Sequence, residues 1–125
     1  MYTAILAQES GYKLHTIRSM KGLYNGEEVT VKTDFGISQQ HYLTIKRMNF
    51  DIDLLLNDLV YSTMAGAKVL SYFYKRYASS EPNWFVRYNV GTRKSAIRSS
   101  AAREYCIKLD KYGAKCRKEL LYAIN

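Results

Sequence analysis

The sequence is poor in proline, glycine and cysteine, and it has no long apolar run. Its 125 residues include one proline, seven glycines and two cysteines. No stretch approaches the roughly 18 consecutive apolar residues of a membrane-spanning helix, and a hydrophobic content of 47% excludes a mostly disordered chain. Two cysteines exclude a disulfide-rich scaffold and favour a reducing, cytoplasmic location. The length predicts a single domain over residues 1–125.

Acidic residues are scarce in the second half of the chain and absent between positions 82 and 103. Lysine and arginine outnumber aspartate and glutamate by 19 to 11, which gives a net charge of +8. Residues 1–60 carry six basic and seven acidic side chains, whereas residues 61–125 carry thirteen and four. Such a basic block creates a local positive potential that attracts a phosphate backbone or an acidic protein surface.

Alternating apolar and polar residues predict strands in the first half. The candidate strands cover residues 2–7, 13–20, 28–33 and 42–48. Asn25-Gly26 is a strong hairpin signal, because both residue types tolerate a positive φ. We expect an N-terminal antiparallel sheet of three to four strands with one apolar face.

Apolar residues spaced three and four apart predict two long helices in the second half, over residues 52–77 and 94–123. Asp51 and Asp53 favour a helix N-terminus at the start of the first. Residues 84–90 read as an extra strand. The predicted fold class is therefore α+β, with the sheet packed against two long C-terminal helices.

Basic and aromatic residues interleave after Pro82. Single-stranded nucleic acid binds such surfaces, because bases stack on rings and each nucleotide carries a charge. We therefore expect a DNA- or RNA-binding protein without catalysis. Tyr88 is the expected stacking ring, and the expected phosphate-binding residues are Arg87, Arg93, Lys94, Arg98, Arg103, Lys108, Lys111, Lys115 and Lys118. In the alternative interpretation, Trp84, Val86 and Tyr88 share one strand face in the core.

Residues 35–47 resemble the turn and recognition helix of a helix-turn-helix. Gly36 would form the turn, Ser38 would cap the helix, and Gln39 and Gln40 would read base edges. The segment before them departs from that pattern, because residues 28–33 alternate like a strand. The competing interpretation is a polar loop followed by an edge strand.

A second functional hypothesis follows from the twelve tyrosines. Tyrosine gives a large contact area at a low cost in entropy, so it is common in protein interfaces. The chain would then be a small interaction or inhibitor protein, such as a bacteriophage or mobile-element accessory protein. It would dock a basic, tyrosine-rich surface on an acidic protein. A homodimer is compatible with both hypotheses, and neither involves a membrane.

Patterns for catalysis, metals and cofactors are weak. Cys106 and Cys116 would lie about 15 Å apart on one predicted helix and could not form a disulfide. His15 and His41 are isolated, and no Cys-x-x-Cys, Walker loop or nucleophile elbow occurs. We therefore expect neither an enzyme nor a metal or cofactor site. The first ten residues carry Glu9 and no basic segment, so they do not read as a signal peptide.

Overall fold

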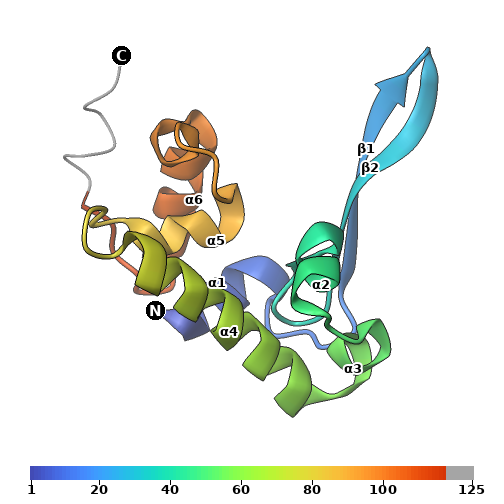
Figure 1. The fold of residues 1–125 in the computed structure, drawn as a ribbon, viewed down its shortest axis with the longest axis horizontal. Coiled ribbons are helices and arrows are strands. Elements are labelled where there is room, and N and C mark those ends of the chain that lie inside the picture. The colour runs from blue at the N-terminus through green and yellow to red at the C-terminus, as the bar shows by residue number, and fades with distance from the viewer. Residues whose placement is uncertain (118–125) are drawn as a thin grey trace. The chain divides into compact units, whose positions relative to one another are not determined.

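The computed structural model describes residues 1–117 (Figure 1). Contacts divide the chain into two compact units: residues 9–66, here the sheet unit, and residues 1–8 with those from 67 onward, here the helical unit. The single-domain organisation expected from the length stays a prediction. The combination of an antiparallel sheet with helices confirms the α+β class. In chain order the elements are α1 (Tyr2–Ser10), β1 (Ile17–Tyr24), β2 (Glu27–Phe35), β3 (Gln40–His41), α2 (Tyr42–Met48), α3 (Ile52–Asn57), α4 (Leu59–Tyr77), η1 (Trp84–Val86), α5 (Arg87–Val90), η2 (Ala96–Arg98) and α6 (Ser100–Asp110).

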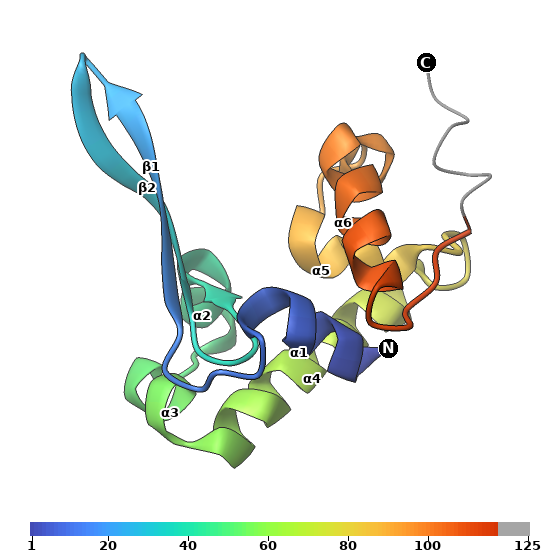
Figure 2. The ribbon, with the colours of Figure 1, turned by 180° about the vertical axis from the view of Figure 1, so that it is seen from behind.

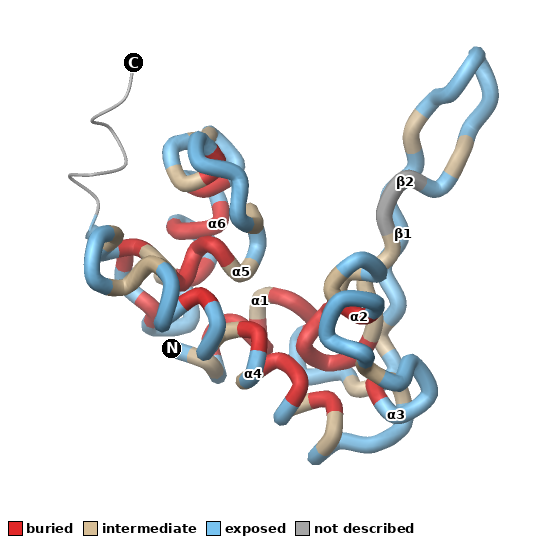
Figure 3. Tube along the Cα trace, viewed as in Figure 1, coloured by how far each residue is buried: buried red, intermediate tan, exposed pale blue. Residues whose placement is uncertain are grey.

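The sheet unit is built on the hairpin of β1 and β2. Asn25 and Gly26 close it with φ angles of 51° and 82°, which confirms the predicted turn. β3 pairs antiparallel with β2 and places His41 opposite Asp34, so the sheet has three strands in the order β1-β2-β3. Most residues of β1 are exposed (Figure 3), whereas Gln40 of β3 is buried.

Helices α2 and α3 contact β2, and together with the first part of α4 they contribute to the apolar core of the sheet unit. This core consists of buried residues with partly buried aromatic rings around them: Ile45, Leu55 and Ala65, with Phe35, Phe50 and Tyr61. The resemblance of residues 35–47 to a helix-turn-helix is not borne out in the fold, because the element before the turn is the strand β2. The turn leads through β3 into α2.

The single helix predicted over residues 52–77 is two helices, α3 and α4. The carboxylate of Asp51 accepts a hydrogen bond from the Leu54 N–H (3.1 Å) and caps α3. Asp58 accepts one from the Tyr61 N–H (2.9 Å) and so satisfies a free donor in the first turn of α4. The second cap restarts the helix, whereas Gly66 lies inside α4 without breaking it.

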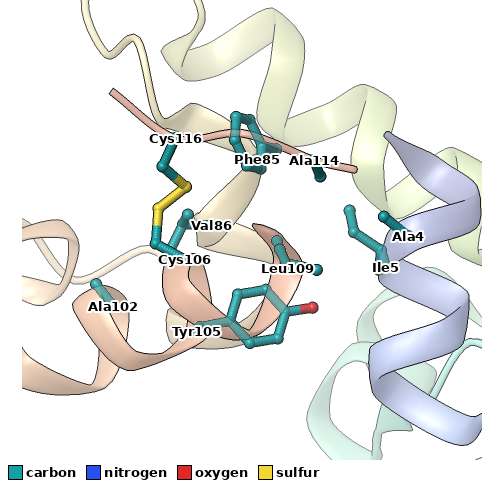
Figure 4. Packing of buried hydrophobic residues seen from close by; sticks show 10 residues of the cluster. All are labelled: Ala4, Ile5, Phe85, Val86, Ala102, Tyr105, Cys106, Leu109, Ala114 and Cys116. Carbon is teal, nitrogen blue, oxygen red and sulfur yellow. A yellow bond between two sulfur atoms is a disulfide. The ribbon is translucent and has the colours of Figure 1, made fainter. Parts of the chain in front are cut away.

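The core of the helical unit joins α1 to the segments after α4 (Figure 4). Helices α5 and α6 lie side by side in both views of the ribbon (Figures 1 and 2). The buried members of this core are Ala4, Ile5, Phe85, Val86, Ala102, Tyr105, Cys106, Leu109, Ala114 and Cys116.

The first predicted strand, residues 2–7, is part of helix α1 instead. Ala4, Ile5, Leu6 and Ala7 are all buried. A continuous apolar run of this length fits a buried helix as well as a buried strand, so its periodicity could not separate the two. The high helix propensity of alanine, leucine, glutamine and glutamate in residues 4–9 agrees with the observed helix.

Two further elements of the second half differ from expectation. Residues 84–90, expected as a strand, form η1 and α5. The last helix was expected over residues 94–123, but α6 begins at Ser100 and ends at Asp110. Ser99 caps its start by accepting a hydrogen bond from the Ala102 N–H (3.1 Å). Residues 118–123 of the expected helix lie outside the described part of the chain.

Cys106 and Cys116 form a disulfide (Figure 4). The expectation that they could not pair was wrong, because it assumed one helix through both residues. The helix ends at Asp110 and Gly113 adopts a φ of 87°, so the chain turns back. The two Cα atoms are therefore 5.8 Å apart, within the range of a disulfide.

We expect reduction of this disulfide to lower the free energy of unfolding by about 3 kcal/mol, because the crosslink restricts the unfolded chain. Urea denaturation of the wild type with and without reductant measures the effect. A variant carrying both Cys106→Ala and Cys116→Ala should lose a similar amount and should no longer respond to reductant. A wild-type midpoint that does not move on reduction would contradict the prediction.

Candidate functional site

Buried polar side chains are concentrated in the sheet unit. Up to residue 117, the helical unit holds two of them, Asn83 and Arg87. Because burying a polar group costs free energy unless it is hydrogen bonded, such a concentration requires a specific arrangement of partners. The buried polar residues of the sheet unit are Glu9, Ser10, Ser38, Gln39, Gln40 and Ser62.

Glu9 lies in the last turn of α1 and is 8% exposed. The helix ends after Ser10, where Gly11 and Tyr12 adopt φ angles of 61° and 64°. This left-handed conformation is a common way to terminate a helix. Among the acidic residues of the described chain, Glu9 alone is buried. Burial disfavours the charged form of a carboxyl group, and carboxyl groups in such surroundings serve as proton donors.

The turn after β2 and the first residue of β3, here together the loop 36–40, are buried and tied to the segment that follows α1. The Gly36 N–H donates to the carbonyl oxygen of Thr16 (2.8 Å), and Nε2 of Gln39 donates to the same oxygen (3.1 Å). Gln39 has a φ of 49°, and its Nε2 also reaches the Gly36 carbonyl (2.8 Å). A left-handed non-glycine residue costs free energy, and such residues cluster at functional sites. The loop is thus held in one conformation by side-chain and backbone contacts.

The same loop is joined to α4 by a short chain of polar contacts. Nε2 of Gln40 lies 2.9 Å from Oγ of Ser38, and that hydroxyl donates to the carbonyl oxygen of Ser62 (3.1 Å). Two buried atoms in this region, Oε1 of Gln39 and Oγ of Ser62, have no hydrogen-bond partner within the described residues. A buried amide oxygen and a buried hydroxyl are therefore available to a bound group or to water.

Gly36 is required by close packing as well as by its backbone angle. Its φ is 81°, and a Cβ atom there would lie 2.5 Å from the carbonyl oxygen of Leu55 and 2.8 Å from Oγ of Ser62. We expect Gly36→Ala to lower the free energy of unfolding by about 3 kcal/mol, combining backbone strain with overpacking. Gly26→Ala is the matched control, because Gly26 has a φ of 82° with no atom within 4 Å of its added Cβ. Equal losses in the two variants, measured by urea denaturation, would contradict the packing argument.

The basic residues predicted from the sequence do not form one track. Arg87 is 2% exposed, and its guanidinium is paired with the Glu81 carboxylate, so it cannot contact a phosphate backbone. Tyr88 is half-buried and packs against the core of the helical unit. Arg93, Lys94 and Arg98 are exposed and lie around a groove of about 1260 Å³ in that unit.

Four other predicted residues are exposed and lie outside that groove. Arg103 and Lys108 are on α6, and Lys111 and Lys115 follow it. Lys118 lies outside the described residues. Within residues 1–117, no three or more histidine, cysteine or acidic side chains gather as a metal site would require. No helix of that part is long and apolar enough to cross a membrane.

A family comparison decides what kind of domain this is. Residues 1–109 match the family model described as Transglycosylase SLT domain. The chain belongs to this family. No curated protein and no solved structure matches it.

The SLT domain is a lytic transglycosylase domain that acts on peptidoglycan, so membership implies an enzyme. The prediction of a nucleic-acid-binding protein without catalysis was therefore wrong, and so was the alternative of a non-catalytic interaction protein. The first was inferred from the uneven placement of basic residues and their interleaving with aromatic residues, and the second from the basic surface and the twelve tyrosines. These properties describe a surface, whereas a function has to be argued from the groups of a site.

Sequence reasoning missed Glu9 as a candidate functional residue. The available signal was an isolated acid: Glu9 is the only acidic residue among the first 26, and it follows the apolar run 4–7. Reading that run as a strand hid the signal. A helix places Glu9 at the end of a buried element, and glutamate is rarely buried unless it has a partner or a function.

Proposed function

We propose that this chain is a lytic transglycosylase-type enzyme that cleaves the glycan strands of peptidoglycan, with Glu9 as its acid catalyst. Membership of the SLT family supports the reaction class. The observation that carries the assignment of the residue is the burial of Glu9, because no other acidic side chain in residues 1–117 is buried. Enzymes that break glycosidic bonds use a carboxylic acid to protonate the leaving oxygen.

The reaction needs one carboxyl group in two roles. In the first step, the protonated Glu9 carboxyl gives its proton to the glycosidic oxygen while the bond from that oxygen to the anomeric carbon breaks. In the second, an acceptor hydroxyl of the glycan attacks the anomeric carbon and passes its proton to the Glu9 carboxylate. The acid form is regenerated, and no water is consumed, as the word transglycosylase requires.

Two polar groups, one in the loop 36–40 and one in α4, are proposed to hold the substrate during these steps. Oε1 of Gln39 accepts hydrogen bonds, and Oγ of Ser62 both donates and accepts them. Sugars and their N-acetyl groups offer hydroxyl and amide partners of both kinds. Because the loop is fixed by contacts to Thr16 and Ser62, these groups are positioned before the substrate binds.

The location follows from the same proposal. The low cysteine content favours the cytoplasm, but the Cys106–Cys116 disulfide favours an oxidising compartment. Peptidoglycan also lies outside the cytoplasmic membrane. We therefore place the activity outside that membrane.

The test is digestion of purified, insoluble peptidoglycan by the disulfide-bonded chain in water enriched in ¹⁸O. We expect the suspension to clear and soluble glycan fragments to appear without ¹⁸O at the cleaved anomeric carbon. A hydrolase would place ¹⁸O there, and that result would overturn the proposed transfer to a hydroxyl. Failure to release any fragment, with a folded chain, would overturn the proposed function.

A further inference from the structure

The groove in the helical unit carries positive charge that the described residues do not neutralise. Its cations come from the end of α4 and from the segment after α5. The side chains of Arg93, Lys94 and Arg98 have no hydrogen bond or ion pair within residues 1–117. Arg76 is held beside the rings of Tyr72 and Tyr77, which leave its charge intact.

The acidic residue in this groove, Glu81, is already neutralised. Arg87 donates to both of its carboxylate oxygens, from Nε (3.0 Å) and from an Nη (2.7 Å). Arginine and carboxylate groups interact most strongly in this bidentate geometry. The charges of Arg87 and Glu81 cancel each other. The net charge of the groove therefore comes from its four other cations, which are Arg76, Arg93, Lys94 and Arg98.

Arg87 also fixes the backbone that carries two of these cations. Its second terminal nitrogen donates to the carbonyl oxygens of Gly91 (3.1 Å) and Arg93 (2.7 Å). The Tyr77 hydroxyl donates to the carbonyl oxygen of Thr92 (3.3 Å), which holds the same segment to α4. The exposed cations therefore project from a fixed backbone, which lowers the entropy lost when an anion binds.

We propose that this groove binds the carboxylate groups of the peptide stems that peptidoglycan carries along its glycan strands. The inference rests on the proposed function, which supplies a polymer with repeated carboxylates. Arginine side chains pair well with carboxylates through their planar donors. The groove then holds the polymer by its charged peptides, while the chemistry at Glu9 acts on its sugars.

The experiment measures sedimentation of the chain with insoluble peptidoglycan that has been freed of attached phosphate polymers. All variants carry Glu9→Gln so that the polymer stays intact. We expect Arg93→Ala together with Arg98→Ala to weaken binding about tenfold, since each exposed ion pair contributes up to about fivefold. Binding should also weaken as salt rises from 0.15 M to 1 M, where the screening length falls from about 8 Å to about 3 Å.

The matched control is Lys108→Ala together with Lys111→Ala. Both lysines are exposed and outside the groove, and the change in net charge is the same. The affinity of this variant should be within about twofold of the affinity of the parent chain. The two lysines that it lacks interact with the polymer only by non-specific attraction, which salt screens. A second arm uses peptidoglycan whose carboxyl groups have been converted to amides, and the parent chain should bind it as weakly as the groove variant binds the untreated polymer.

Each outcome decides the proposal. Unchanged binding by the groove variant, an equal loss in the control, or full binding to the amidated polymer would overturn it. Digestion by the wild type is scored separately. If the wild type digests peptidoglycan but the groove variant binds as well as the parent chain, the inference is rejected and the proposed function stands. If binding depends on the groove but the wild type digests nothing, the proposed function alone is rejected.

Discussion

Glu9→Gln is expected to lower the rate of peptidoglycan cleavage by about 10³-fold, because an amide cannot give a proton to the leaving oxygen. Glutamine has nearly the shape of glutamate and keeps the polar contacts that an uncharged side chain can make. Folding should therefore survive, and stability should stay the same or rise, since a buried carboxylate is costly. The measurement is release of soluble fragments from insoluble peptidoglycan, with circular dichroism and thermal unfolding as checks on the fold.

The matched control for that variant is Glu104→Gln, which makes the same chemical change at an exposed position on α6. It should cleave at the wild-type rate. If Glu9→Gln keeps more than a tenth of the activity, Glu9 is not the proton donor. Equal losses in the two variants would instead point to a requirement for net charge.

Arg87→Ala is expected to lower the free energy of unfolding by about 3 kcal/mol, because it breaks a buried ion pair by removing one partner. The estimate is at the lower end of the usual range, since the Glu81 side chain is 21% exposed and water can partly solvate its carboxylate. The carbonyl oxygens of Gly91 and Arg93 also lose their donor, and the Tyr77 ring loses the guanidinium 4.3 Å from its centre.

Urea denaturation measures this loss, and Arg98→Ala serves as its control. Arg98 carries the same charge but is exposed, so its removal should change the free energy of unfolding by no more than about 0.5 kcal/mol. A second variant, Glu81→Gln with Arg87→Met, removes both charges and should recover part of the stability. If Arg87→Ala costs no more than Arg98→Ala, the buried pair does not hold the helical unit together.

The parts of the fold that sequence could predict are those determined by neighbouring residues. Asn25-Gly26 forms its turn because the two residues tolerate positive φ wherever they occur. The end of α4 at Tyr77 was also predictable, since it follows from the three- and four-residue spacing of the apolar residues. The break at Asp58 was less visible, because its side chain could have been either a surface acid or a cap.

The candidate site was not predictable in the same way, because it depends on burial and on distant partners. The sequence predicts Arg87 as a phosphate contact, whereas the structure pairs it with Glu81, six residues earlier in the chain. The pairing of Cys106 with Cys116 depends on where α6 ends. Glu9 differs from a surface glutamate only by its tertiary surroundings, and these are absent from a pattern of residue types.

In the helical unit, the residue that stabilises the backbone of the groove differs from the residues that give the groove its charge. The residue that fixes the segment 91–93 is buried, and the cations that face solvent take no part in holding it. Substitution of an exposed cation therefore changes the free energy of unfolding little, whereas substitution of Arg87 or Glu81 lowers it. Related chains could thus retune the groove toward differently charged wall polymers by surface substitutions alone, with the buried pair retained.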